Sequence, residues 1–165
     1  MDNLQLSQGG NFAFTSGALA AGTNAGTIKT TVAIVYTING QFRTNKAITD
    51  NIAISYTGPT VYSTPANGSF TGLVGGSTRL YGIFLDTTGA VTIVPGPVVN
   101  TAQLAAGTAA LHFPPAQRDK ACIGAMRVAV TANTTFVPGT TALDASGVTT
   151  TFLNLSSMPG EPLLS

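Results

Sequence analysis

The sequence predicts an all-β fold, an antiparallel β-sandwich or jelly-roll-like domain, and three observations support this fold class. The polar residues are mostly Thr, Ser, Asn and Gly, and the β-branched side chains of Thr and Val fit a pleated, half-buried surface. Nineteen Gly and nine Pro residues place turn signals along the chain, as in domains built from many short strands. No segment keeps a helical hydrophobic period for more than about two turns.

The clearest strand is predicted at residues 27–39, where apolar and polar side chains alternate along the whole segment. Its more apolar face is expected to carry Ile28, Thr30, Val32, Ile34, Tyr36 and Ile38. Asn39-Gly40 is a type I′ hairpin signal, so residues 42–46 are expected to pair back on this strand.

The remainder of the chain continues the pattern of short strands and turns. Further strands are expected at residues 47–56, 69–74, 78–86, 90–94, 121–131 and 148–155. Gly75-Gly76 is a hairpin candidate, and the Asp-Thr-Thr-Gly sequence of residues 86–89 predicts a turn. The Pro-Gly-Pro sequence of residues 95–97 is expected to end a strand, and residues 102–110 are the one place where a short helix is expected, because Ala and Leu cluster there.

Residues 1–26 differ from the rest, because they are rich in Gly, Ala, Ser and Asn and show no sustained alternation. Two interpretations stay open. One is a poorly ordered terminus, which is the usual default. The other is an extended N-terminal arm that orders against a partner, and its partner-binding residues would be Leu4, Leu6, Phe12 and Phe14. Residues 27–165 are expected to form a single β domain.

The composition excludes several classes of protein. Charged residues make up 8% of the 165 residues, against a usual share of about 25%, and the net charge is +1. A hydrophobic content of 44% excludes a disordered chain, and seven cations balanced by six anions weigh against nucleic-acid binding. No stretch approaches the roughly 18 apolar residues of a membrane span, and the first residues do not resemble a secretory signal. We therefore expect a soluble protein made in a cytosol, with neither nucleic acid nor membrane as a partner.

Few residues could carry out catalysis. His112 is the sole histidine, and a Ser-His-Asp triad would need it beside Asp119 or Asp144, but no G-x-S-x-G pattern is present. The favoured interpretation is that His112 makes one hydrogen bond in a strand or loop. Cys122, the sole cysteine, cannot form an intramolecular disulfide and is expected to be a buried, inert thiol.

Two further patterns favour turns over chemistry. Asp86 and Asp144 lie in turn sequences, where Asp bends the chain through its own side chain. Residues 72–78 weakly resemble a phosphate-binding loop, but they lack the lysine and no helical pattern follows. We therefore expect a protein that is not an enzyme, with no catalytic residues, no cofactor and no metal site.

The shortage of charge leads to an expectation about the surface. With so few ions, apolar groups must cover more of the exterior than usual, and large exposed apolar patches generally mark contact surfaces. We expect a sizeable part of this surface to be buried against other protein chains. The competing interpretation is a neutral, Thr-coated β domain that stays monomeric.

In residues 120–149, a Lys-Ala-x-Ile-Gly strand precedes a Phe-x-Pro-Gly-Thr-Thr-x-Leu-Asp-x-x-Gly-Val segment. With these two patterns the C-terminal part of the chain resembles structural proteins of tailed-bacteriophage virions, and the likeness is firmest here. The Leu-Asp-Thr-Thr-Gly turn at residues 85–89 is similar as well, so that the resemblance spans roughly residues 79–155. Among virion proteins, the chain is most like a head decoration, or cement, protein, because it is short and has no repeat of fixed period.

The resemblance implies a non-enzymatic protein that binds and stabilises the major-capsid shell of a tailed phage. Its implied partners are the major capsid protein and further copies of itself, with a trimer favoured over a dimer. The implied location is the exterior of the capsid in the virion, after synthesis in the cytoplasm of the bacterial host.

Two alternatives stay open. A fibre or spike module could bind a host surface receptor or glycan, for which exposed aromatic side chains would be needed, and the sequence offers Tyr36, Tyr56, Tyr62 and Tyr81 but no Trp. A small hydrolase could be built on His112.

Overall fold

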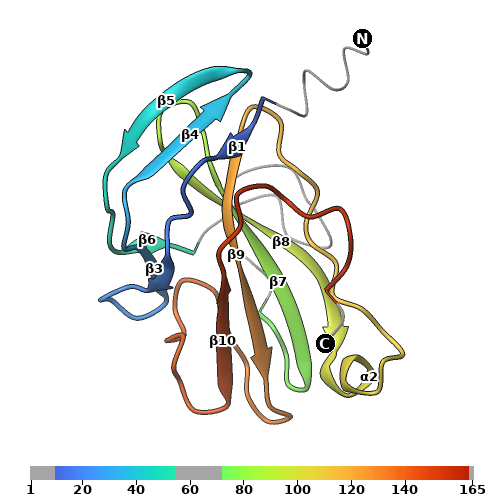
Figure 1. The fold of residues 1–165 in the computed structure, drawn as a ribbon. Helices are drawn as coiled ribbons and strands as arrows, with labels where there is room; N and C mark the ends of the chain where they lie inside the picture. Colours follow the sequence, from blue (N-terminus) through green and yellow to red (C-terminus); the bar gives the residue numbers. More distant parts are fainter. Residues whose placement is uncertain (1–9, 55–71, 164–165) are drawn as a thin grey trace.

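The computed structural model describes residues 10–54 and 72–163, and these residues are mostly β-strand with one short helix (Figure 1). The all-β fold class is therefore confirmed. The elements are β1 (Phe12–Ala13), β2 (Leu19–Ala21), β3 (Thr27–Thr30), β4 (Ile34–Ile38), β5 (Gln41–Lys46), β6 (Ile52–Ala53), β7 (Ser77–Leu85), β8 (Val91–Asn100), α2 (Thr101–Ala105), β9 (Ala121–Val130) and β10 (Val148–Leu153).

The strands form two sheets. The larger has the order β5-β4-β1-β9-β7-β8, with β10 also paired to β9, and the smaller has the order β2-β3-β6. Most pairs are antiparallel, as predicted, but β1 runs parallel to β9, with Phe12 opposite Cys122. Because β4 and β9 run in opposite directions, a strand placed between them must be parallel to one of them. The larger sheet is thus mixed, and the purely antiparallel prediction is wrong at this pair.

The core is built around β7, in which every residue is buried. Its alternate residues point to opposite faces, and both faces are covered. The main core cluster joins β7 and β9 to the smaller sheet, because it contains Leu19 and Ile28 together with Ile83 and Met126. A second cluster of Leu80, Leu104 and Leu111 packs α2 and the following loop against the other face of β7.

The strand predicted at residues 27–39 is two strands in different sheets. β3 belongs to the smaller sheet and β4 to the larger, and the chain bends at residues 31–33 between them. Thr31 stabilises this bend, since its Oγ1 donates to the carbonyl of Ala18 and its N–H to that of Gly17. The bend leaves Val32 46% exposed, so the prediction that Val32 shares the apolar face of the strand is wrong. Ile28 and Ile34, predicted for the same face, are buried as expected.

Two predicted turns are confirmed. Asn39 and Gly40 both have positive φ, at 52° and 72°, and join β4 to β5 by a two-residue connection in which Ile38 faces Gln41. Asp86 closes the turn between β7 and β8, because its Oδ1 accepts hydrogen bonds from the backbone N–H groups of Thr88 and Ala90.

Other predicted boundaries are corrected. β8 continues through residues 95–97, because it is an edge strand where the missing Pro N–H removes no ladder bond. Gly75-Gly76 does not join a hairpin: β7 pairs with β8 and β9, and the N–H of Gly76 donates to the carbonyl of Val130. Residues 47–56 contain only the short β6, and residues 55–56 and 69–71 lie outside the described residues.

The helix and the last two predicted strands are confirmed with small changes. The helix is α2, shorter than the predicted residues 102–110, and it begins after the cap Asn100, whose side chain accepts from the N–H groups of Ala102 and Gln103. Gly107 stops the segment with a φ of 69°. β9 and β10 lie within the predicted residues 121–131 and 148–155.

The N-terminal arm expected at residues 1–26 is not confirmed in the part that the structure describes. Residues 12–13 form β1 between β4 and β9, and residues 19–21 form β2 in the smaller sheet. These residues therefore belong to the same sheets as the strands beyond residue 27. Residues 1–9 lie outside the described residues.

Candidate functional site

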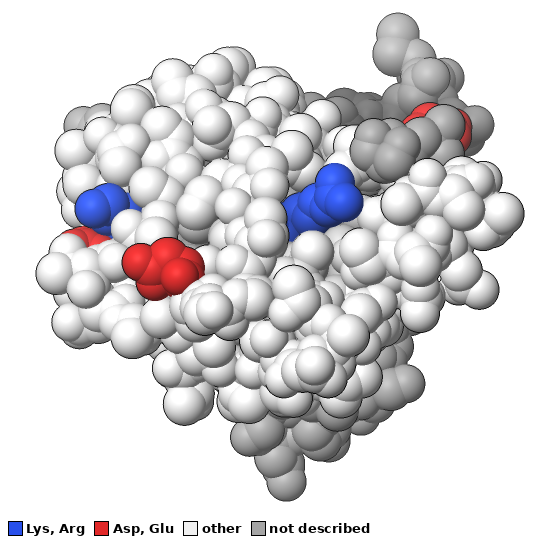
Figure 2. All heavy atoms as spheres, turned by 90° about the horizontal axis from the view of Figure 1, so that it is seen from below, with Lys and Arg blue, Asp and Glu red and all other residues white. Residues whose placement is uncertain are grey.

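The described surface carries few charges, and those present are scattered. On the face shown in Figure 2, Lys, Arg, Asp and Glu form isolated spots within an otherwise uncharged exterior. Among residues 10–54 and 72–163, the ion pair is that of Arg118 with Asp119, at 3.5 Å and largely exposed. Such a pair contributes little to stability.

Three phenylalanines gather on one face of the β1-β4-β5 part of the larger sheet, and we call them the Phe cluster: Phe12, Phe14 and Phe42. The ring centroids of Phe12 and Phe14 lie 4.8 Å apart, and those of Phe14 and Phe42 lie 5.5 Å apart. These separations are typical of favourable aromatic pairs. Phe14 is 54% exposed and Phe42 is 61% exposed, so the cluster faces solvent.

The strand register explains the Phe cluster. Phe12 is opposite Thr37 in β4, and Thr37 is opposite Phe42 in β5, so that these three residues form one row across three strands. Phe14 follows β1 in a bend, where its N–H donates to the carbonyl of Val35 at 2.8 Å, and its ring lies against that of Phe12. The hairpin at Asn39-Gly40 therefore brings Phe42 to the rings near the N-terminus.

The structure thus places two of the four predicted partner-binding residues together and adds one that the sequence reasoning missed. Phe12 and Phe14 lie in contact, and Leu4 and Leu6 lie outside the described residues. Phe42 could have been identified, because the two-residue hairpin fixes it opposite Thr37. What the sequence did not show was the insertion of β1 beside β4.

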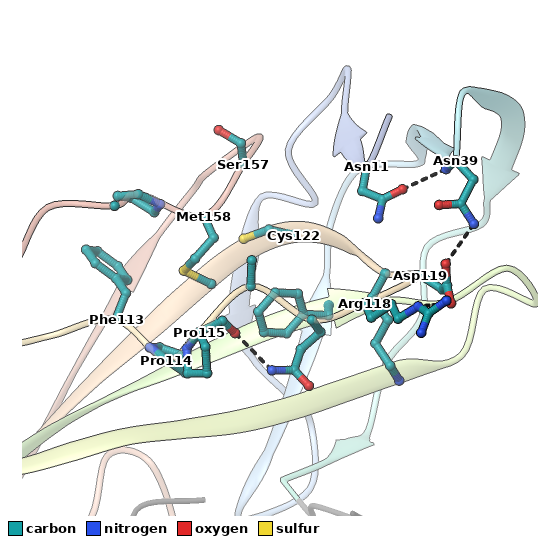
Figure 3. Close-up of a pocket in the computed structure, with 16 residues that line it drawn as sticks. Asn11, Asn39, Phe113, Pro114, Pro115, Arg118, Asp119, Cys122, Ser157 and Met158 are labelled. Carbon is teal, nitrogen blue, oxygen red and sulfur yellow. Dashed lines mark hydrogen bonds and ion pairs between the residues drawn. The ribbon is translucent and has the colours of Figure 1, made fainter. Parts of the chain in front are cut away.

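A pocket of about 1080 Å³ opens beside the start of β9 (Figure 3). It is formed by the loop of residues 113–120, the C-terminal segment around Met158, and the ends of β1 and β4 near Asn11 and Asn39. Its lining residues are Asn11, Asn39, Phe84, Phe113, Pro114, Pro115, Ala116, Gln117, Arg118, Asp119, Lys120, Cys122, Ser157, Met158, Pro159 and Gly160.

One end of the pocket carries a connected set of polar groups. The Oδ1 of Asn11 accepts from the N–H of Asn39 at 2.6 Å, and the Nδ2 of Asn39 donates to the Oδ1 of Asp119 at 2.7 Å (Figure 3). The other carboxylate oxygen of Asp119 faces the Nε of Arg118. The Nε2 of Gln117 donates to the carbonyl of Pro115, which fixes its amide as well.

The opposite end is apolar. Phe113, Pro114 and Met158 lie together on this side in Figure 3, and Phe84 and Cys122 are buried beneath. The predicted burial of Cys122 is confirmed, and this burial raises the pKa of its thiol to about 11.

The other residues considered for chemistry lie apart from one another. His112 is exposed in the loop after α2, and Asp86 holds a local turn. Asp50 instead joins two distant loops, because its carboxylate accepts from both the N–H and the Oγ1 of Thr23. Burial opposes ionisation of Asp86, but hydrogen bonds from Thr88 and Ala90 outweigh it and lower the pKa. A hydrogen bond from the side chain of Thr23 is the main cause of the lowered pKa of Asp50. Within the described ranges, no three His, Cys, Asp or Glu side chains lie close enough to hold a metal ion.

Arg79 is an unusual cation in the middle of β7. It is only 3% exposed, and its Nε and Nη1 have no hydrogen-bond partner. Its guanidinium carbon lies 6.0 Å from the ring centroid of Tyr81, at the outer limit of a cation–π contact. Burial raises the pKa of Tyr81 to about 12. Sequence reasoning did not single out Arg79, because the residues around it predict a strand but do not indicate that both faces of that strand are buried.

Comparisons with protein-family models, curated proteins and solved structures found no match to this chain. The resemblance to tailed-phage virion proteins therefore stays a prediction. In the part of the chain that the structure describes, no helix is long and apolar enough to cross a membrane.

Proposed function

We propose that this protein is a non-enzymatic cement protein that binds the outside of a tailed-phage head and stabilises its shell. The observation that carries the proposal is the Phe cluster, an exposed aromatic surface on an exterior with few charges. The likeness of residues 79–155 to virion proteins supports the same function. The two sheets would pack as a jelly-roll-like sandwich, which the shared core of Leu19, Ile28, Ile83 and Met126 supports.

The Phe cluster has the chemistry of an interface anchor. Aromatic side chains are enriched in the buried centres of protein interfaces, where a few residues carry most of the binding free energy. Phe42 lies in β5, and Phe14 directly follows β1, where its N–H donates to the carbonyl of Val35 at 2.8 Å, so little backbone order is lost when a partner covers them. The partner in this proposal is the major capsid protein.

Repetition would turn a modest contact into a stable one. A homo-oligomer, with a trimer favoured, places several Phe clusters on neighbouring capsid subunits, and linked contacts bind far more tightly than single ones. Contacts between apolar groups also persist at salt concentrations that screen surface ion pairs. This combination suits a protein that holds shell subunits together in varied surroundings.

Binding to purified heads tests the proposal. Heads of the phage that encodes the chain, prepared without this protein, are mixed with wild type, with the double variant Phe14→Ser/Phe42→Ser, or with the control Val74→Ser/Val137→Ser. The control removes two exposed apolar side chains outside the Phe cluster. We expect co-sedimentation of the wild type and the control, and an affinity at least about 30-fold weaker for the Phe variant.

Two results would overturn the proposal. One is wild-type protein that does not sediment with heads at micromolar concentration. The other is equal binding by wild type and the Phe variant. Wild-type protein found only on tail structures would favour the alternative, a fibre or spike module that binds a host receptor.

A further inference from the structure

We propose that the pocket beside the start of β9 is a binding site for a neutral saccharide. This proposal goes beyond attachment to a shell, since the pocket is formed by other residues than Phe14 and Phe42 and has a different chemistry. The ligand class is one or two hexopyranose rings, with hydroxyl groups toward the polar end and a C–H face toward the apolar end.

The polar end supplies groups that suit vicinal hydroxyls. A hydroxyl both donates and accepts, so that planar amides and carboxylates, which present donors and acceptors side by side, bind pairs of hydroxyls well. Asn11, Asn39 and Asp119 are already held in place by the hydrogen bonds of 2.6 and 2.7 Å that link them. Those bonds use the Oδ1 of Asn11 and the Nδ2 of Asn39, which leaves the Nδ2 of Asn11 to donate and the Oδ1 of Asn39 to accept.

Gln117 extends the same pattern. Its Nε2 donates to the carbonyl of Pro115 at 2.9 Å, which orients the Oε1 as an acceptor at the pocket wall. Because these side chains are fixed before a ligand arrives, little conformational entropy is lost on binding.

The apolar end suits the other side of a sugar ring. A pyranose presents C–H groups on its faces, and these pack on aromatic rings and other apolar surfaces, whose negative π face attracts the C–H hydrogens. Phe113 and Met158, which are half-buried, supply such a surface opposite the amides, and the buried Pro114 packs beside Met158 (Figure 3). Polar groups at one end and apolar groups at the other match a ring that is itself amphipathic.

Size and charge narrow the ligand class further. A volume of about 1080 Å³ lies at the upper end of the range of small-molecule sites, so there is room for more than one ring. The polar end is formed by the neutral amides of Asn11 and Asn39 together with the carboxylate of Asp119, which would repel an anion placed against them. A neutral ligand therefore fits the site better than a phosphate or a carboxylate.

Direct titration with defined sugars tests this inference. Glucose, galactose, mannose, N-acetylglucosamine and their common disaccharides are titrated into the full chain while amide shifts are followed by NMR. We expect at least one of them to bind with a dissociation constant in the millimolar range or tighter, with the largest shifts at residues 113–120 and 157–160.

Matched variants identify the pocket as the place of binding. Asp119→Asn removes an acceptor, and Asn tolerates the positive φ of 55° at this position. We expect this variant and Gln117→Ala each to weaken binding about tenfold. The control Asp144→Asn, in a turn outside the pocket, should bind as the wild type does.

Several results would overturn the inference. They are the absence of shifts with every sugar at concentrations of order 50 mM, shifts confined to other parts of the molecule, or equal binding by Asp119→Asn and Asp144→Asn. A pocket that takes only proline-rich peptides would also contradict it. The outcome is separable from that of the proposed function, because Phe14→Ser/Phe42→Ser should bind sugar normally and Asp119→Asn should bind heads normally.

Discussion

Replacing the buried Arg79 with methionine is expected to stabilise the protein. Arg79 is 3% exposed, its Nε and Nη1 lack partners, and the described residues place no carboxylate within ion-pair distance of it. A buried charge without a carboxylate partner costs several kcal/mol in desolvation, even after the surroundings relax. Methionine is unbranched and apolar, so it can occupy most of the same space in β7 without that cost.

The magnitude follows from two opposing contributions. Loss of the interactions with Tyr81, which are a cation–π contact at 6.0 Å and a side-chain hydrogen bond, removes about 0.5–2 kcal/mol. Relief of the desolvation cost is larger, about 2–4 kcal/mol. We therefore expect Arg79→Met to raise the free energy of unfolding by about 1–3 kcal/mol, which for a chain of this length raises Tm by about 2–10 °C.

Urea unfolding followed by circular dichroism measures this difference, with Arg118→Met as the matched control. The side chain of Arg118 is 95% exposed, so this control should stay within about 0.5 kcal/mol of the wild type. The m-value should be the same for all three proteins, because the surface exposed on unfolding hardly changes. Destabilisation of Arg79→Met by more than about 1 kcal/mol beside a neutral control would refute the reasoning, because the guanidinium would then have stabilising partners.

Three further predictions concern local features. Stability should fall as the pH drops below about 4, because the pKa values of Asp50 and Asp86 are lowered in the folded state and the unfolded state therefore binds more protons. In urea titrations at several pH values, the double variant Asp50→Asn/Asp86→Asn should show a smaller loss of stability on acidification than the wild type. An equal loss in the two proteins would contradict this prediction. Cys122 should react with a thiol reagent at pH 8 at least about a hundredfold more slowly in the native protein than in urea, and equal rates would show that the thiol is accessible. Gly75→Ala should lower stability by more than about 2 kcal/mol, since its Cβ would overlap the carbonyl oxygen of Ala132, whereas Gly160→Ala meets no atom and should be neutral by thermal unfolding.

The features that could be predicted from the sequence are those set by residues close together in the chain. The hairpin at Asn39-Gly40 and the turn at Asp86 were found because each depends on the φ preference or the side-chain acceptor of its own residues. The burial of Cys122 followed from its apolar strand neighbours. In these cases the physical cause lies within a few positions of the chain.

Features that depend on distant pairing were not predicted. β1 has only two residues, and nothing in Phe12–Ala13 indicates that it lies between β4 and β9. The same insertion assembles the Phe cluster, and the pocket depends on a hydrogen bond between Asn39 and Asp119, 80 positions apart. The alternation of residues 27–39 correctly predicted that Ile28 and Ile34 are buried, but it predicted neither the exposure of Val32 nor the break in the strand, because the bend at Thr31 is held by hydrogen bonds to residues 17 and 18.

Cryo-electron microscopy of heads carrying the protein tests the central claim most directly, because it shows whether the Phe cluster is the surface that meets the shell. We predict density for the β4–β5 hairpin against the major capsid protein, with the rings of Phe14 and Phe42 buried between the two. Bound protein in which these rings stay exposed to solvent, or heads that carry none of the protein, would contradict the account.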